Sequence, residues 1–123
     1  MDIKDLMKPV YILDKDIPLA EAADIMSSKG FSSIVYVKDK RIAGIITERD
    51  LLMNFDKEGT VSQIMTKKVI TIDSDSDVEE ALDLMKKYEI KKLPVIEKGK
   101  LVGIIKLIDI ARHVDEVDED FFF

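Results

Sequence analysis

The stretch Gly-Ile-Ile-Thr-Glu-Arg-Asp-Leu at residues 44–51 shows how the chain is built, because it returns 59 residues later as Gly-Ile-Ile-Lys-Leu-Ile-Asp-Ile at residues 103–110. With the same offset, eight of the 35 residues from 18 to 52 are identical to residues 77 to 111. Nearly all the remaining apolar positions pair with apolar positions. The chain therefore contains two copies of one supersecondary unit.

Each copy has the hydrophobic pattern of a β-α-β-β-α unit. Apolar residues at positions i, i+3, i+4 and i+7 predict a helix from Leu19 to Met26, and the same spacing recurs from Val78 to Met85. Two β-rich runs separated by three residues follow each helix and predict a hairpin. The predicted strands are residues 10–13, 33–37 and 41–46, then 69–72, 93–96 and 100–105; the closing helices are 48–55 and 107–114, and the short helical leads are 2–7 and 61–65. The predicted fold class is α/β (α+β).

The repeat also predicts the domain organisation. At 123 residues the chain has the size of one domain. Each copy, at about 60 residues, would bury too little surface to fold stably on its own, so the copies are expected to share a core. We assign residues 1–58 to the first repeat with its lead and linker, residues 59–114 to the second repeat, and residues 115–123 to an acidic, Phe-ending tail that is expected to be flexible.

Composition excludes several functional classes. Five of the acidic residues lie between 115 and 120. The rest of the chain has 19 basic and 20 acidic side chains, so it has no excess of positive charge with which to bind nucleic acid. No apolar run approaches the roughly 20 residues of a membrane span, and the N-terminus lacks a signal pattern, which favours a cytoplasmic protein with no membrane partner. Zero cysteines and a single histidine leave no metal site. No paired nucleophile and base indicates an enzyme, so no catalytic residue is assigned.

The tandem β-α-β-β-α unit, the sequence Leu93-Pro94-Val95, and the motif of glycine, two aliphatic residues, Ser or Thr, two residues and Asp resemble a CBS domain pair, or Bateman module, in a stand-alone protein. The resemblance covers residues 6–113. It implies that the two repeats pack through their sheets with pseudo-two-fold symmetry and form two clefts for an adenosine-containing ligand. The implied ligands are AMP, ADP, ATP or S-adenosylmethionine, with no required cofactor. It also implies a homodimer, a four-repeat disc that signals to a further protein target.

The chemistry of the motif fits such a ligand. One fixed carboxylate can accept hydrogen bonds from both ribose hydroxyls, and Asp50 and Asp109 are placed for this role. Glycine at 44 and 103 would let a ligand approach the backbone closely. Thr47 with Asp50 is equally typical of a helix N-terminal cap. Lys106 replaces that threonine in the second copy while Asp109 remains, and this pattern favours a role for the carboxylate that is separate from capping.

The resemblance implies that each cleft combines the Asp motif of one repeat with the first strand and the second-strand entry of the other. The first cleft, which we rank first because it matches the motif fully, would hold Thr47, Arg49, Asp50, Lys68, Val69, Ile70, Lys92, Leu93 and Pro94. The second would hold Lys106, Asp109, Tyr11, Ile12, Ser32, Ser33 and Ile34.

Two other functions remain open at this level. S-adenosylmethionine is an alternative ligand to a nucleotide. A ligand-free module for protein interaction or oligomerisation is a second alternative, suggested by the incomplete second motif. Hydrolysis of a nucleotide is disfavoured, because the chain has no Walker-type glycine loop.

Overall fold

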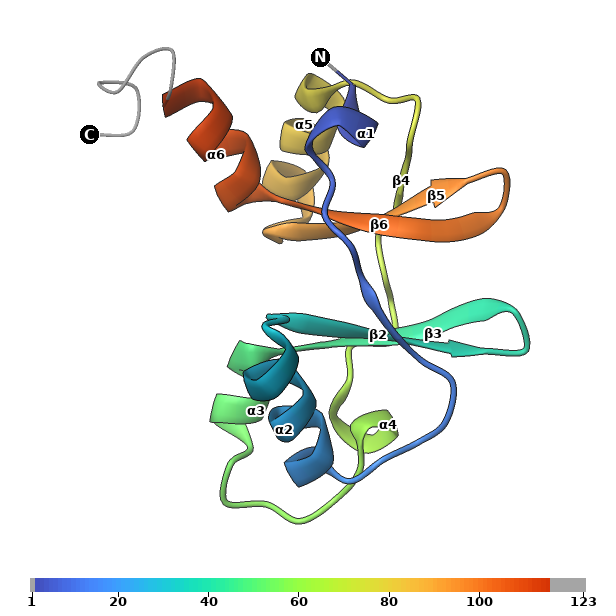
Figure 1. Cartoon of the computed structure of the whole chain (residues 1–123), viewed down its shortest axis with the longest axis vertical. Helices are drawn as coiled ribbons and strands as arrows, with labels where there is room; N and C mark the ends of the chain where they lie inside the picture. Colours follow the sequence, from blue (N-terminus) through green and yellow to red (C-terminus); the bar gives the residue numbers. More distant parts are fainter. Residues whose placement is uncertain (1, 116–123) are drawn as a thin grey trace. The chain divides into compact units, whose positions relative to one another are not determined.

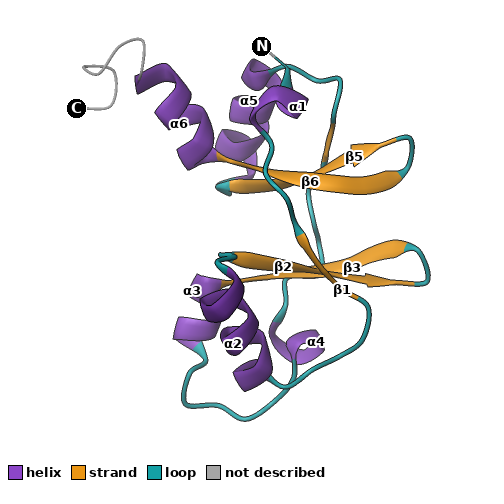
Figure 2. Ribbon diagram, in the orientation of Figure 1, coloured by secondary structure: helices purple, strands orange, loops and turns teal. Residues whose placement is uncertain are grey.

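The computed structural model describes the backbone of residues 2–115 and the side chains of residues 2–113. The chain divides into two compact units, each with one three-stranded sheet and helices (Figures 1 and 2). We call Val10–Val69 the first-repeat unit, and Met1–Pro9 with Ile70–Phe123 the second-repeat unit. The mixed α/β class expected from the sequence is confirmed.

The first-repeat unit follows the predicted order of elements. Its elements are β1 (Tyr11–Leu13), α2 (Leu19–Lys29), β2 (Ser33–Lys38), β3 (Arg41–Thr47), α3 (Glu48–Met53) and α4 (Val61–Ile64). The sheet order is β1-β2-β3, with β1 parallel and β3 antiparallel to β2. Both residues of the β2–β3 turn, Asp39 at φ 53° and Lys40 at φ 64°, are left-handed, as a two-residue hairpin turn matched to the strand twist requires.

The second-repeat unit has the same β-α-β-β-α order, with its short helix α1 coming first in the chain. Its elements are α1 (Ile3–Leu6), β4 (Ile72–Asp73), α5 (Val78–Tyr88), β5 (Lys92–Glu97), β6 (Lys100–Lys106) and α6 (Leu107–Asp115). The sheet order is β4-β5-β6. The predicted strand at residues 69–72 is wrong in extent, because β4 pairs with β5 only at Ile72 and Asp73.

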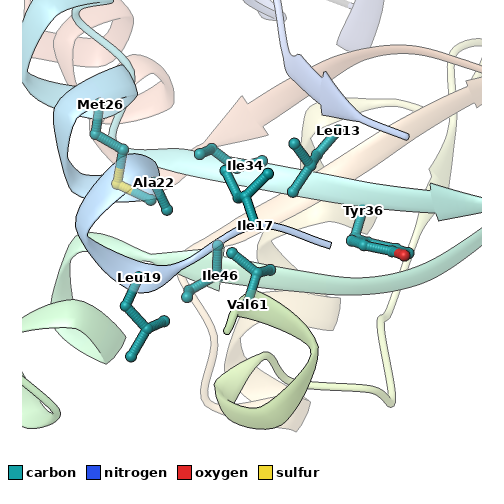
Figure 3. Close-up of a cluster of buried hydrophobic side chains, with 9 residues drawn as sticks. All are labelled: Leu13, Ile17, Leu19, Ala22, Met26, Ile34, Tyr36, Ile46 and Val61. Carbon is teal, nitrogen blue, oxygen red and sulfur yellow. The ribbon is translucent and has the colours of Figure 1, made fainter. Parts of the chain in front are cut away.

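Each unit has its own hydrophobic core. In the first-repeat unit, apolar side chains of the sheet meet the inner stripe of α2 and one residue of α4 (Figure 3). The cluster is Leu13, Ile17, Leu19, Ala22, Met26, Ile34, Tyr36, Ile46 and Val61. The second-repeat unit has the matching cluster Ile3, Ile72, Ala81, Met85, Leu93, Val95, Ile105 and Ile110. Burial of these side chains is the main stabilising term for each unit.

The two lead helices are exchanged relative to the sequence repeats. The chain after α1 forms a bridge between Lys8 and Ile104 of β6, with N···O distances of 2.8 and 2.9 Å. The chain after α4 forms the equivalent bridge between Thr66 and Ile45 of β3, with distances of 2.9 and 3.0 Å. Each lead therefore belongs by contact to the unit of the other repeat. The boundary at residue 58 follows the repeated sequence, whereas the contacts divide the chain near residues 9 and 69.

The tail predicted at residues 115–123 lies almost wholly outside the described residues. Asp115 is the last residue of α6, and the prediction for residues 116–123 is untested.

Candidate functional site

The closing helix of each unit begins immediately after the third strand, which places the motif carboxylate on its first turn. The first free N–H of each helix is satisfied in the same way. Glu48 donates from its backbone N to the Ser32 carbonyl at 3.0 Å, and Leu107 donates to the Lys91 carbonyl at 2.9 Å. The start of the helix is thus fixed to the entry of the second strand in both units.

Thr47 and Asp50 form a capping box in the first-repeat unit. Asp50 Oδ2 accepts from the Thr47 backbone N at 2.8 Å and from Thr47 Oγ1 at 3.0 Å, while the Asp50 backbone N donates to Thr47 Oγ1 at 3.3 Å. This is the capping alternative for the pair, and it is present. Both side-chain bonds end on Oδ2, so Oδ1 lies outside the capping box.

Asp109, at the equivalent position of the second-repeat unit, lacks the capping partner that Asp50 has. Lys106 stands where Thr47 stands in the other unit and has no oxygen with which to cap the helix. Oδ2 of Asp109 is buried and has no hydrogen-bond partner among the described residues. A buried carboxylate oxygen without a partner is unfavourable, and a hydroxyl donor from a ligand would relieve that cost.

The other predicted site residues fall into both units. The first-repeat unit holds Tyr11, Ile12, Ser32, Ser33, Ile34, Thr47, Arg49, Asp50, Lys68 and Val69, and the second-repeat unit holds Ile70, Lys92, Leu93, Pro94, Lys106 and Asp109. Each predicted cleft therefore draws residues from both units, and its assembly stays a prediction.

Strand register brings some of these residues together within a unit. Ser33 pairs with Thr47 across β2 and β3, and Lys92 pairs with Lys106 across β5 and β6. The entry of the second strand therefore lies beside the motif of the same unit. The two paired lysines give the second-repeat unit a concentration of positive charge that its counterpart lacks, and this charge is suited to an anionic group.

Two predicted contacts are core side chains. Ile34 and Leu93 are fully buried in the hydrophobic clusters of their units. Both residues lie within paired strands, Ile34 opposite Ile46 and Leu93 opposite Ile105. Ile12, by contrast, is 48% exposed, and the ring of Tyr11 lies edge-on to Phe31 at 5.5 Å between centroids.

The two motif glycines leave space in which the lead segments pack against the third strand of each unit. A Cβ at Gly44 would lie 2.4 Å from Sδ of Met65 and 2.9 Å from the Thr66 carbonyl oxygen. A Cβ at Gly103 would lie 2.9 Å from both the Lys8 carbonyl oxygen and Sδ of Met7. The space of the absent side chain is occupied by the chain's own lead, and the expected role in ligand approach stays a prediction.

The sequence interpretation did not identify a groove between α2 and α3 in the first-repeat unit. It has a volume of about 500 Å³ and is lined by Leu19, Ala20, Ala23, Met26, Ser27, Glu48, Leu51, Leu52, Asn54, Phe55 and Lys57. The signal was the run of small residues at 20, 23 and 27, where the second repeat has Glu79, Leu82 and Lys86.

The part of the chain that the structure describes contains no group of three or more His, Cys, Asp or Glu side chains placed to hold a metal ion. None of its helices is long and apolar enough to cross a membrane.

Comparison with known proteins identifies the repeats. Residues 3–57 and 61–116 each match the family model described as the CBS domain. An uncharacterized 17.7 kDa protein of Acidianus ambivalens is 37% identical over 113 residues, which are 88% of this chain and 69% of that protein. The inosine-5'-monophosphate dehydrogenase of Thermoplasma acidophilum is 36% identical over 88% of this chain, but the match spans only 22% of that enzyme.

Solved structures show the same architecture. The CBS domain pair of protein MJ0100, in complex with 5'-methylthioadenosine and S-adenosyl-L-methionine, has a TM-score of 0.87 and 30% identity, covering 96% of this chain and 98% of that one. The cytosolic domain of the Mg²⁺ channel MgtE, in complex with ATP, has a TM-score of 0.77 and 28% identity, covering 91% of this chain and 48% of that one.

Proposed function

Because this chain belongs to the CBS domain family and carries two of its repeats, we propose that it is a regulatory module that senses an adenosine-containing ligand. The ligand, AMP, ADP or ATP, binds in clefts formed where the Asp motif of one repeat meets the strands of the other. Occupancy changes the geometry of a homodimer and is passed to a protein target. The module itself catalyses no reaction.

The observation that carries this proposal is Oδ2 of Asp109 at the start of α6, which is buried and has no hydrogen-bond partner in residues 2–113. A ribose offers two adjacent hydroxyl donors, and a carboxylate accepts both through charge-assisted hydrogen bonds. Lys106, directly before the helix, supplies a cation for a phosphate or carboxylate of the same ligand. The sequence ranks the Asp50 cleft first, but the hydrogen bonds favour the Asp109 site, because Asp50 Oδ2 is already committed to Thr47.

S-adenosylmethionine is the second candidate ligand. It is favoured by the bound ligands of the MJ0100 pair, whereas ATP is favoured by the MgtE domain. Both molecules contain the same adenosine, so the ribose contact is common to them. They differ in the group attached at the 5' carbon, which is where the charges of Lys106 and Arg49 would discriminate.

The proposal is tested by thermal unfolding of protein that has been refolded to strip any bound ligand. The ligands are AMP, ADP, ATP and S-adenosylmethionine, with GTP as the control. A ligand at 100 times its Kd stabilises the folded state by about 2.7 kcal/mol, a shift of several degrees at this chain length. We expect a shift with adenosine compounds alone. No shift with any of them would favour a ligand-free interaction module instead.

A further inference from the structure

The second-repeat unit carries a group of lysines that the first repeat lacks. With the offset of 59 residues, every lysine of this group stands where the first repeat has a serine or a threonine. The lysines are Lys86, Lys87, Lys91, Lys92 and Lys106, and their counterparts are Ser27, Ser28, Ser32, Ser33 and Thr47. We call these five lysines the lysine patch. Because the first repeat forms the same elements without them, the fold does not require their charge.

Contacts between elements bring the lysine patch together at one end of the sheet. The last turn of α5 carries Lys86 and Lys87. Lys92, the first residue of β5, pairs with Lys106, the last residue of β6. Lys91 fixes the start of α6, because its carbonyl accepts from the first backbone N of that helix at 2.9 Å. The end of α5, the start of β5 and the start of α6 therefore meet in one place (Figure 1).

Positive charge is in excess at the lysine patch. Lys86, Lys87 and Lys91 are exposed, and none of the three forms an ion pair with another residue of 2–113. Two acidic residues, Glu89 and Asp109, lie among the five lysines, so the formal charge of the group is five minus two, or +3. Like charges held close together repel one another, and a bound anion would relieve that repulsion.

The chain itself contains a segment of the opposite charge. Five acidic residues occur in the six positions from Asp115 to Asp120, at and after the end of α6. A block of like charge at a chain end is typical of an interaction segment. The equivalent residues 56–61 of the first repeat are Asp-Lys-Glu-Gly-Thr-Val, with a net charge of −1. The lysines and the acidic segment therefore occur together in one repeat and are both missing from the other.

The acidic segment is long enough to reach the lysine patch. The nine residues of α6 span about 14 Å, and the five residues 116–120 span about 16 Å when extended. We propose that residues 116–120 fold back along α6 and bind the lysine patch of their own unit. The attachment gives the segment a local concentration on the order of millimolar. A segment from a second copy would have to bear the full entropy of association instead.

Disulfide trapping tests this contact without any ligand. The chain has no cysteine, so a pair of engineered thiols is unambiguous. One thiol is Phe121→Cys, directly after the acidic segment, and the other is Tyr88→Cys, an exposed position between Lys87 and Lys91. The matched control has the same two thiols and a neutral tail, made by Glu116→Gln, Asp118→Asn, Glu119→Gln and Asp120→Asn. Both proteins have the same tether, so any difference in rate reports charge.

We expect the disulfide to form within one chain, and about fivefold faster with the acidic tail than with the neutral tail. In about 1 M NaCl the two rates should become equal, because exposed ion pairs are screened. Equal rates at low salt would overturn the proposal. Disulfide-linked dimers in place of the intramolecular product would assign the acidic segment to a second copy.

The contact also predicts competition with a charged ligand, a step that rests on the proposed function. Lys106 belongs to the lysine patch and is the residue proposed to bind the phosphate of the nucleotide. An acidic segment bound there about two-thirds of the time would weaken ATP binding about threefold. Adenosine has no phosphate, so its affinity should not depend on the tail.

Isothermal titration of ATP and of adenosine into the full chain with the acidic or the neutral tail measures this competition. A second control has the same change in net charge placed on exposed residues of the first-repeat unit, Asp14→Asn, Glu21→Gln, Asp24→Asn and Glu58→Gln. We expect the neutral tail alone to strengthen ATP binding, by about threefold. Equal strengthening in the second control would overturn the competition. If no protein binds either ligand, the proposed function fails, and the trapping result still decides the contact.

Discussion

Asp50 and Asp109 occupy equivalent positions in the two units, yet only the first is satisfied by its own chain. In the first-repeat unit, Thr47 donates two hydrogen bonds to the Asp50 carboxylate. In the second-repeat unit, Lys106 replaces the threonine, and Oδ2 of Asp109 is buried with no hydrogen-bond partner within the described part of the chain. The duplicated framework is the same, and the contrast between the two carboxylates follows the substitution of the capping threonine by Lys106.

A similar contrast separates the outer helical faces. Small residues on α2 and large exposed ones on α3 leave a groove in the first-repeat unit. At the equivalent positions of α5 the second repeat has Glu79, Leu82 and Lys86. The two units therefore share the apolar positions of the core and differ in the side chains on the outer surface of their helices.

The largest expected change in stability tests a feature that both units share, the packing of a lead segment against the motif glycine. Gly44→Ala and Gly103→Ala should each lower the free energy of unfolding by about 2 to 3 kcal/mol, because the new methyl group meets the lead segment closer than van der Waals contact allows. Urea denaturation measures both. Met65→Ala should partly rescue Gly44→Ala, since Sδ of Met65 is the nearest atom. Two neutral substitutions would show that the leads are not held against β3 and β6.

The next prediction is that removing each of the two carboxylates changes the free energy of unfolding in opposite directions. Asp50→Ala removes the capping box and should cost about 1 kcal/mol of unfolding free energy. Asp109→Ala removes an unpartnered buried oxygen and should raise the stability of the ligand-free protein by about 1 kcal/mol. Chemical denaturation of stripped protein gives both values. If both variants are destabilised alike, the contrast between the two sites is wrong.

A smaller difference lies at the ends of α2 and α5. Gly30 and Glu89 are equivalent C-caps, both left-handed at φ 75° and 54°. A side chain with a Cβ is strained in this conformation, so Glu89→Gly should stabilise by about 1 kcal/mol and Gly30→Ala should destabilise by a similar amount. No atom of the described residues lies within 4 Å of a Cβ at Gly30, so its substitution reports backbone conformation alone. Equal and unchanged melting temperatures would contradict this.

The smallest effect concerns the start of α4. Asp16 accepts from the Ser62 backbone N at 2.9 Å, from Thr60 Oγ1 at 2.8 Å and from Ser62 Oγ. Although desolvation acts to raise it, these hydrogen bonds lower the pKa of Asp16 below its ordinary value of 3.8. A lowered folded-state pKa contributes stability above the unfolded value, which is lost as pH falls through the folded value.

Asp16→Ala should therefore lower the free energy of unfolding by about 0.5 kcal/mol at neutral pH, a small value because the carboxylate is exposed. The difference from wild type should shrink as pH falls below about 4. Thermal unfolding between pH 3 and 7 measures it. A difference that does not change with pH would assign the effect to packing.

Much of the fold could be predicted from the sequence, because the signals are local. The apolar spacing of α2 and α5 and the β-rich runs of the two hairpins correspond to observed elements within one or two residues at most ends. Composition predicts a strand at residues 69–72, yet Ile72 alone among these four residues pairs with β5. A strand needs a partner in register, and composition does not supply that information.

The sequence could not predict that each lead segment packs on the unit of the other repeat, for a related reason. Met7 and Met65 stand at equivalent places, and so do the glycines that they contact, so the pattern is the same whichever copy a lead joins. The state of the two carboxylates also depends on geometry. Thr47 with Asp50 suggests either a cap or a ligand site, and only the hydrogen bonds show the cap in one unit and the unpartnered oxygen in the other.

Isothermal titration of an adenosine ligand into stripped wild-type, Asp109→Ala and Asp50→Ala proteins tests the central claim most directly. A carboxylate that accepts from ribose loses charged hydrogen bonds worth about 1.5 to 3 kcal/mol each when it is removed. We therefore expect Asp109→Ala to weaken binding at least tenfold, and by more than Asp50→Ala does. Unchanged affinity in the Asp109→Ala protein would contradict the account.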